Sequence, residues 1–76
     1  MNTSELLLYY AFEIATETSF FVAVNENKET LNALFDQLLA ETDEDVTYAT
    51  GFVSAKNVEA ALLCIQRGTW NYTQKV

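Results

Sequence analysis

The feature that most constrains the fold is an apolar stripe between residues 28 and 40. Five large apolar side chains recur there at helical spacing: Leu31, Leu34, Phe35, Leu38 and Leu39. Positions i, i+3, i+4, i+7 and i+8 lie on one face of an α-helix, so the segment predicts a helix with a single buried face. Asn27 suits the N-cap, and Glu29 suits the positive end of the helix dipole. Such a helix needs a second layer that covers its stripe.

A second helix is expected from about residue 55 to residue 67. Ser54 is placed to cap it, Arg67 suits the negative end of its dipole, and Gly68 is a natural left-handed terminator. The expected buried stripe consists of Val58, Ala61, Leu62 and Ile65. Cys64 adjoins this stripe, which indicates a packed and unreactive thiol rather than a nucleophile.

Alternating apolar residues predict strands in the segments that remain. One run alternates through Phe20, Val22 and Val24, and another through Val46, Tyr48, Thr50 and Phe52. The β-branched and aromatic side chains of both runs suit a pleated surface. Trp70 and Tyr72 suggest a short last strand. The alternation in each run predicts that its successive side chains point to opposite faces of a sheet.

Residues 6–16 fit two structures. A strand face would carry Leu8, Tyr10, Phe12 and Ile14, whereas a helix capped by Ser4 would bury Leu7, Tyr10, Ala11 and Ile14. We favour the strand, because residues 16–19 (Thr-Glu-Thr-Ser) would then form the turn of a hairpin that spans residues 6–25. The alternative stays open at this point, since an apolar run of this length cannot be assigned by periodicity alone.

The resulting element order is β-β-α-β-α-β, which predicts one α+β domain over residues 1–76. Two helices with one apolar stripe each predict two layers, with both helices on one face of a mostly antiparallel sheet. The other face would then present aromatic side chains such as Tyr9 and Phe21, and an apolar patch of this kind is typical of an interaction surface. The alternative is that these side chains belong to the core.

Charge is divided unevenly along the chain. The protein has 11 acidic residues, 4 basic residues and no histidine, for a net charge of −7. Through residue 45, ten acids oppose Lys28 alone, which gives −9; after it, Glu59 opposes Lys56, Arg67 and Lys75, which gives +2. A field of this sign repels nucleic acid and anionic membranes and attracts basic protein surfaces.

The residue types present exclude several kinds of site. A triad nucleophile normally needs a histidine base, and a zinc site needs three or four Cys and His ligands. The densest carboxylate cluster is Asp43, Glu44 and Asp45, but an EF-hand loop counted from Asp43 would need a glycine at Tyr48 and a glutamate at Ser54. An enzyme using carboxylates alone would need a cleft of roughly 300 Å³, which is not expected in so short a chain. We therefore predict no catalysis, no metal and no cofactor.

Other features bear on the compartment and on nucleic acid. A single cysteine fits the reducing cytoplasm. The apolar run of residues 6–12 follows Glu5 directly, unlike a signal peptide, and it is too short to span a bilayer. Trp70, Tyr72 and the nearby cations Arg67 and Lys75 are a weak indication of base stacking, opposed by the net charge. We expect a cytoplasmic protein without direct membrane or nucleic-acid contact.

These observations favour a non-enzymatic protein whose acidic surface binds a basic surface, and most specifically an inhibitor that occupies a nucleic-acid-binding groove. The expected partner-binding residues are Glu26, Glu29, Asp36, Glu41, Asp43, Glu44 and Asp45. In size, charge and lack of catalytic motifs, the chain resembles the small acidic inhibitors of bacteriophages, such as anti-CRISPR and antirestriction proteins. This resemblance involves no sequence motif. The alternative is a self-associating structural or regulatory module, a homodimer that uses an apolar sheet face or a strand edge.

Overall fold

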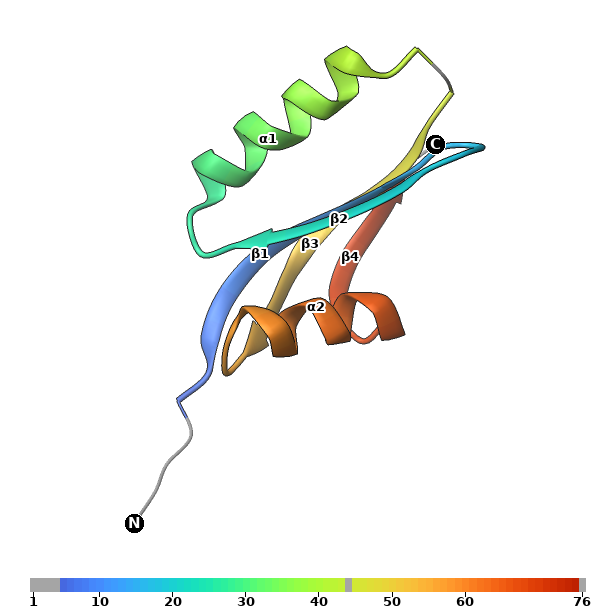
Figure 1. The fold of residues 1–76 in the computed structure, drawn as a ribbon. Helices are drawn as coiled ribbons and strands as arrows, with labels where there is room; N and C mark the ends of the chain where they lie inside the picture. Colours follow the sequence, from blue (N-terminus) through green and yellow to red (C-terminus); the bar gives the residue numbers. More distant parts are fainter. Residues whose placement is uncertain (1–4, 44, 76) are drawn as a thin grey trace.

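Two nine-residue strands form the middle of the sheet in the computed structural model, which describes residues 5–43 and 45–75. The elements run β1 (Leu7–Ala15), β2 (Phe20–Asn25), α1 (Lys28–Glu41), β3 (Thr47–Ala55), α2 (Val58–Arg67) and β4 (Asn71–Lys75). This is the predicted order, and residues 6–16 contain a strand rather than a helix. The described residues form one small α+β fold (Figure 1).

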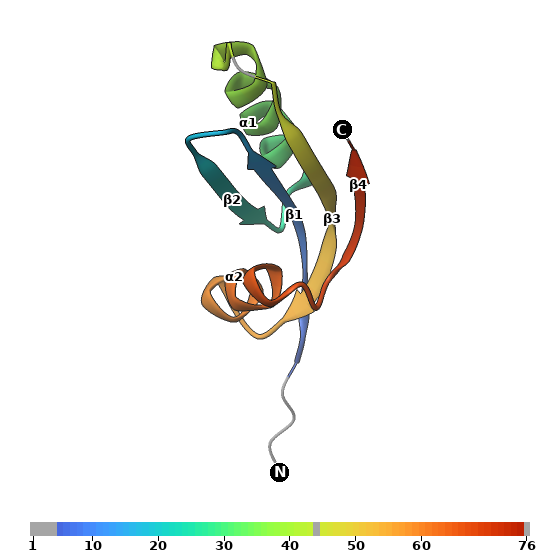
Figure 2. The ribbon, with the colours of Figure 1, turned by 90° about the vertical axis from the view of Figure 1, so that its right-hand side faces the viewer.

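The strands are arranged in the order β2-β1-β3-β4, and each neighbouring pair is antiparallel. β1 and β3 pair along their whole length, from Leu7 opposite Ala55 to Ala15 opposite Thr47. β2 and β4 are the outer strands, as Figure 2 shows. The chain therefore leaves the β1–β2 hairpin through α1 to reach β3, and leaves β3 through α2 to reach β4.

The two helices lie on opposite faces of the sheet, which corrects the prediction that both cover one face (Figure 1). Alternate residues of β1 belong to different cores. Tyr9 and Ala11 pack with residues of α2, whereas Phe12 and Ile14 pack with Leu31 of α1. The physical reason is that β1 is apolar on both of its sides, as is usual for a strand buried on both faces.

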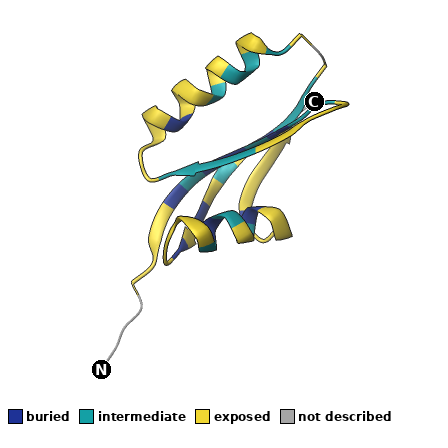
Figure 3. Ribbon diagram, in the orientation of Figure 1, coloured by how far each residue is buried: buried dark blue, intermediate teal, exposed yellow. Residues whose placement is uncertain are grey.

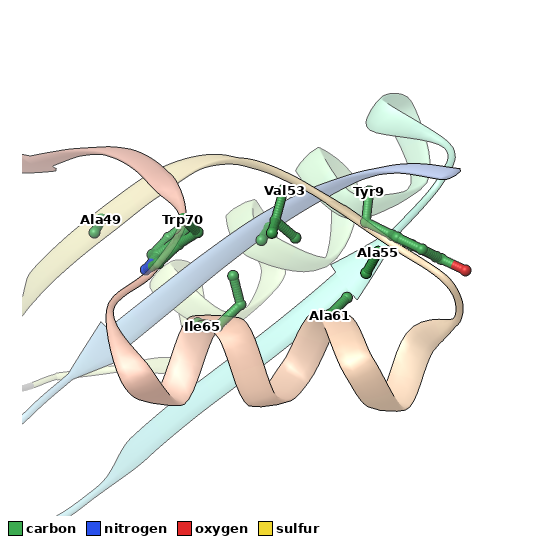
Figure 4. Close-up of a cluster of buried hydrophobic side chains, with 8 residues drawn as sticks. Tyr9, Ala49, Val53, Ala55, Ala61, Ile65 and Trp70 are labelled. Atoms are coloured by element: carbon green, nitrogen blue, oxygen red, sulfur yellow. The ribbon is translucent and has the colours of Figure 1, made fainter. Parts of the chain in front are cut away.

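The core beneath α2 is built around small side chains. Figure 4 shows Ala61 and Ile65 directed from α2 toward the sheet, where they meet Val53 and Ala55. Tyr9 and Trp70 close this cluster and are 3% and 7% exposed. Tyr9 was expected on an uncovered face, so that interpretation is wrong and the alternative, a core position, is confirmed.

The core beneath α1 is aromatic. The ring of Phe35 makes edge-on contacts with the rings of Phe12 and Tyr48, each with a centroid distance of 5.1 Å. Leu31 is buried, but Leu34 is 40% exposed, so the predicted burial of the whole stripe is only partly correct. Figure 3 shows that the outer side of α1 is mostly exposed.

Capping residues set the ends of both helices. The Asn27 side chain accepts a hydrogen bond from the Thr30 amide at 2.9 Å, as predicted. The second helix begins later than expected: its cap is Asn57 rather than Ser54, because β3 continues to Ala55. Gly68 ends α2 in the left-handed conformation, with a φ of 74°.

The turn between β1 and β2 is closed by one threonine. The Thr16 hydroxyl accepts hydrogen bonds from the amides of Thr18 and Ser19 at 3.2 and 2.9 Å, and the Thr16 amide donates to the Ser19 carbonyl. A hydroxyl that satisfies nearby amides in this way is typical of Ser/Thr turns. It fixes the register of the predicted hairpin.

Candidate interaction surface

Six of the seven predicted partner-binding carboxylates lie in the described residues, and all six are exposed. Glu26 precedes α1, Glu29 is in its first turn, Asp36 is in its middle and Glu41 is its last residue. Asp43 and Asp45 follow in the connector to β3, and Glu44 lies outside the described residues. We call the six described residues the acidic surface.

The helical part of this surface is a ridge along α1. Glu29 and Asp36 are seven residues apart, so they return to nearly the same side of the helix at an axial distance of about 10 Å. Ala33 and Ala40 occupy neighbouring positions on that side and are exposed. Because alanine side chains are short, the carboxylates project beyond their neighbours on this ridge.

The fold adds a carboxylate that the sequence did not indicate. Ala15 pairs with Thr47, which places the β1–β2 turn beside the connector that precedes β3. Glu17 and Asp45 thereby line the same open hollow of about 480 Å³. The sequence pattern does not indicate that Glu17 lies near Asp45, because the two residues are 28 positions apart in the chain and only the fold brings them together. Within the described ranges, no three acidic or cysteine side chains are grouped closely enough to hold a metal ion.

Lys28, the single base of the acidic half, is directed toward an aromatic ring. Its ammonium lies 5.6 Å from the ring centroid of Tyr10, within the range of a cation–π contact. Lys28 and Tyr10 line a groove of about 250 Å³ between α1 and β3. Its lining, taken from the described residues, contains Phe12, Phe35 and Phe52 but no carboxylate, so the groove does not bring together a carboxylate pair.

The half of the chain that follows residue 45 offers a different surface. The Trp70 and Tyr72 rings stack at 4.9 Å, but Trp70 is buried, so it is not presented to an unpaired base. Tyr72 remains exposed. Cys64 is half-buried and packs against the α2 core, as expected of a structural thiol.

Comparisons with protein-family models, with curated proteins and with solved structures found no match. The helices of the described residues are too short or too polar to cross a membrane.

Proposed function

We propose that this protein is a non-enzymatic inhibitor whose acidic surface occupies a basic, nucleic-acid-binding surface of a cytoplasmic partner protein. The observation that carries the proposal is that six carboxylates between residues 26 and 45 are all exposed along α1 and its two flanking connectors. Glu17 extends this field beside Asp45. In such a complex the carboxylates stand where phosphates would otherwise bind lysine and arginine.

The spacing of the charges determines how the surface would act. A DNA strand carries one charge about every 3.4 Å, whereas Glu29 and Asp36 are about 10 Å apart along the helix. Screening at physiological salt has a length of about 8 Å, so neighbouring carboxylates on α1 act nearly independently. Affinity would therefore come from individual carboxylates that each meet a cation at contact distance, rather than from a uniform field.

The proposal predicts that the partner's complex with this protein weakens as salt rises and competes with the partner's nucleic acid. Both ligands would depend on the same lysine and arginine side chains. An inhibitor of this kind acts as anti-CRISPR and antirestriction proteins do, by blocking a host complex from its nucleic-acid target.

The test is a pair of double charge reversals with equal net charge. Asp36→Lys with Asp43→Lys alters the acidic surface, and Glu5→Lys with Glu59→Lys alters exposed acids elsewhere; each raises the net charge from −7 to −3. Proteins are captured from a nuclease-treated host lysate, and the captured protein is tested for displacement from nucleic acid.

We expect the first pair to abolish capture and displacement, and the second pair to leave both intact. Exposed substitutions usually change stability by only about 0.5 kcal/mol, so circular dichroism should show both variants folded. Equal loss of capture in both variants would mean that net charge alone governs binding. Retained capture by the Asp36 and Asp43 variant would refute the proposed surface.

A further inference from the structure

The outer edge of β2 is poorly protected against pairing with another strand. In the described part of the chain, β2 has a strand partner on one side only, and its other side is open (Figure 2). Its six residues contain no charge and no proline. Edge strands of natural proteins usually carry lysine, proline or other devices that prevent such pairing. β2 contains neither lysine nor proline.

The opposite edge of the sheet differs in composition. β4 consists of Asn, Tyr, Thr, Gln and Lys, and it contains no aliphatic residue. Polar and charged residues of this kind disfavour association between edges. One edge of the sheet is therefore suited to remain solvated, and the other is suited to be covered.

Apolar side chains flank the open edge on both faces. Phe20 and Phe21 are 59% and 39% exposed and, from their pairing with Ala15 and Ile14, point to the α2 face and the α1 face respectively. On α1, Phe35 leans toward Tyr48 of β3. Leu34 is on the other flank of the apolar stripe, toward β2, which explains its exposure.

We propose that two copies of this chain pair through β2, antiparallel and about a two-fold axis perpendicular to the sheet. The two sheets would then form one continuous sheet, with both copies of α1 on one face and both copies of α2 on the other. Such an interface is isologous, and it closes after two copies. The occupant is a second copy because β2 is uncharged and its exposed side chains are apolar, so antiparallel self-pairing joins apolar residues without placing charges opposite one another.

The sequence of β2 selects the register. A perpendicular two-fold axis keeps each residue on its own face of the sheet, so one residue of β2 must lie on the axis, opposite its own copy. In the middle of β2 that residue is Val22 or Ala23. With Val22 on the axis, Phe21 faces the small Ala23 of the second copy and Phe20 faces Val24. With Ala23 on the axis, Phe21 would face the amide of Asn25. Over residues 20–24 the first register joins apolar residues only, and it places Asn25 opposite Ser19. Aromatic pairs with β-branched residues, such as Phe20 with Val24, are favourable across strands.

Charge also permits this register. Residues 20–24, which face one another in this register, carry no charge, and the nearest carboxylates, Glu17 and Glu26, lie outside β2. No carboxylate is placed directly opposite another, an arrangement that would be destabilising. A standard interface buries about 800 Å² from each partner, more than five paired residues supply, so Leu34 and its neighbours on α1 must contribute. We therefore expect a dimer that dissociates on dilution.

The dimer is independent of the proposed inhibitor function, and salt distinguishes the two. Each copy carries a charge of −7, so screening should strengthen self-association. Binding of the acidic surface to a basic partner should weaken under the same change. Failure of one proposal therefore leaves the other standing.

The first experiment measures the dissociation constant of the dimer by sedimentation equilibrium, from micromolar to submillimolar protein. Phe21→Lys should weaken the dimer at least about tenfold, because pairing would desolvate the new ammonium. Leu63→Lys is the matched control, since Leu63 is 46% exposed on the outer side of α2, and it should change the constant less than about twofold. A monomer at every concentration, or equal weakening by both variants, would overturn the proposal.

The second experiment tests the register by mild oxidation of single-cysteine variants in a Cys64→Ala background. Directly opposite strand residues are close enough for a disulfide, whereas diagonal neighbours at about 7–8 Å are not. Val22→Cys should cross-link rapidly, and Ala23→Cys and Gln74→Cys should not. Cross-linking through Ala23→Cys would overturn the register, and cross-linking through Gln74→Cys would overturn the choice of edge. These variants also serve if Phe21→Lys does not fold.

Discussion

Gly51 shows how one residue can set the position of a strand. A Cβ atom at this position would overlap the carbonyl oxygen of Asn71, the first residue of β4. Glycine therefore allows the backbones of β3 and β4 to approach closely. Gly68 has a different role. There is space for a side chain at this position, but its positive φ strains any residue other than glycine.

Gly51→Ala should displace β4 and lower the free energy of unfolding by about 2–3 kcal/mol, as expected for an added group without space. Gly68→Ala should cost about 1 kcal/mol from backbone strain alone. Chemical denaturation followed by Trp70 fluorescence checks both, because Trp70 directly precedes β4 and should report its displacement. Equal stability of Gly51→Ala and the wild type would contradict the close approach.

At the scale of elements, α1 covers β2 and β1, the two strands on one side of the sheet. Its apolar stripe is wider than the surface beneath it, so Leu31 is buried and Leu34 is not. The helical period identifies the stripe, but it cannot indicate how much sheet lies below each side. That depends on the strand order, which is a property of the whole fold.

Two substitutions of the same type on this helix should therefore differ in effect. Leu31→Ala should lower the free energy of unfolding by about 2–5 kcal/mol, because it opens a cavity in the α1 core. Leu34→Ala should cost less, about 1 kcal/mol, because Leu34 is already 40% exposed and its removal leaves no enclosed cavity. Urea denaturation of both variants at low micromolar concentration, where the proposed dimer dissociates, is the measurement. Similar losses would show that α1 sits differently on the sheet.

Local signals explain most of what the sequence predicts correctly. Asn27, Gly68 and the Thr16 turn each satisfy or redirect backbone groups nearby, so their effects do not depend on distant parts of the chain. The sequence does not locate the start of α2, because Ser54 and Asn57 are both good caps, and the extension of β3 to Ala55 decides in favour of Asn57.

The placement of the helices could not be obtained in the same way. An apolar residue on β1 looks the same whichever helix covers it, so one-faced and two-faced burial give similar sequences. For the candidate surface, exposure of Asp36 follows from the helical period alone. Glu17 joins Asp45 only through the register of β1 with β3, which no local pattern specifies.

At the scale of the whole molecule, two small cores share one sheet and the negative charge is concentrated in the first half of the chain. Self-repulsion among like charges opposes the compact state and is reduced by salt. A domain of this size has a small free energy of unfolding, so modest changes in charge repulsion should produce measurable changes in its melting temperature.

Raising ionic strength with sodium chloride should raise the melting temperature by about 2–5 °C, since a change of 1 kcal/mol moves the melting temperature of such a domain by about 4–8 °C. Calcium chloride at the same ionic strength should give the same curve, because the effect is screening and not coordination. Differential scanning fluorimetry at low micromolar protein compares the two. A further rise of several degrees with calcium alone would reveal a site at the acidic connector.

The pairing of β1 with β3 has a consequence for folding during synthesis. Leu7 must find Ala55, 48 residues later, and Ala15 must find Thr47, 32 residues later. The β1–β2 hairpin can form as soon as it leaves the ribosome, but the central pair of the sheet must wait for β3. Closing loops of this length costs conformational entropy before the stabilising contacts between β1 and β3 can form, and this slows folding. α1 precedes β3 and can cover one face of β1 early, but the other face, with Tyr9 and Ala11, stays uncovered until β3 and α2 have been made.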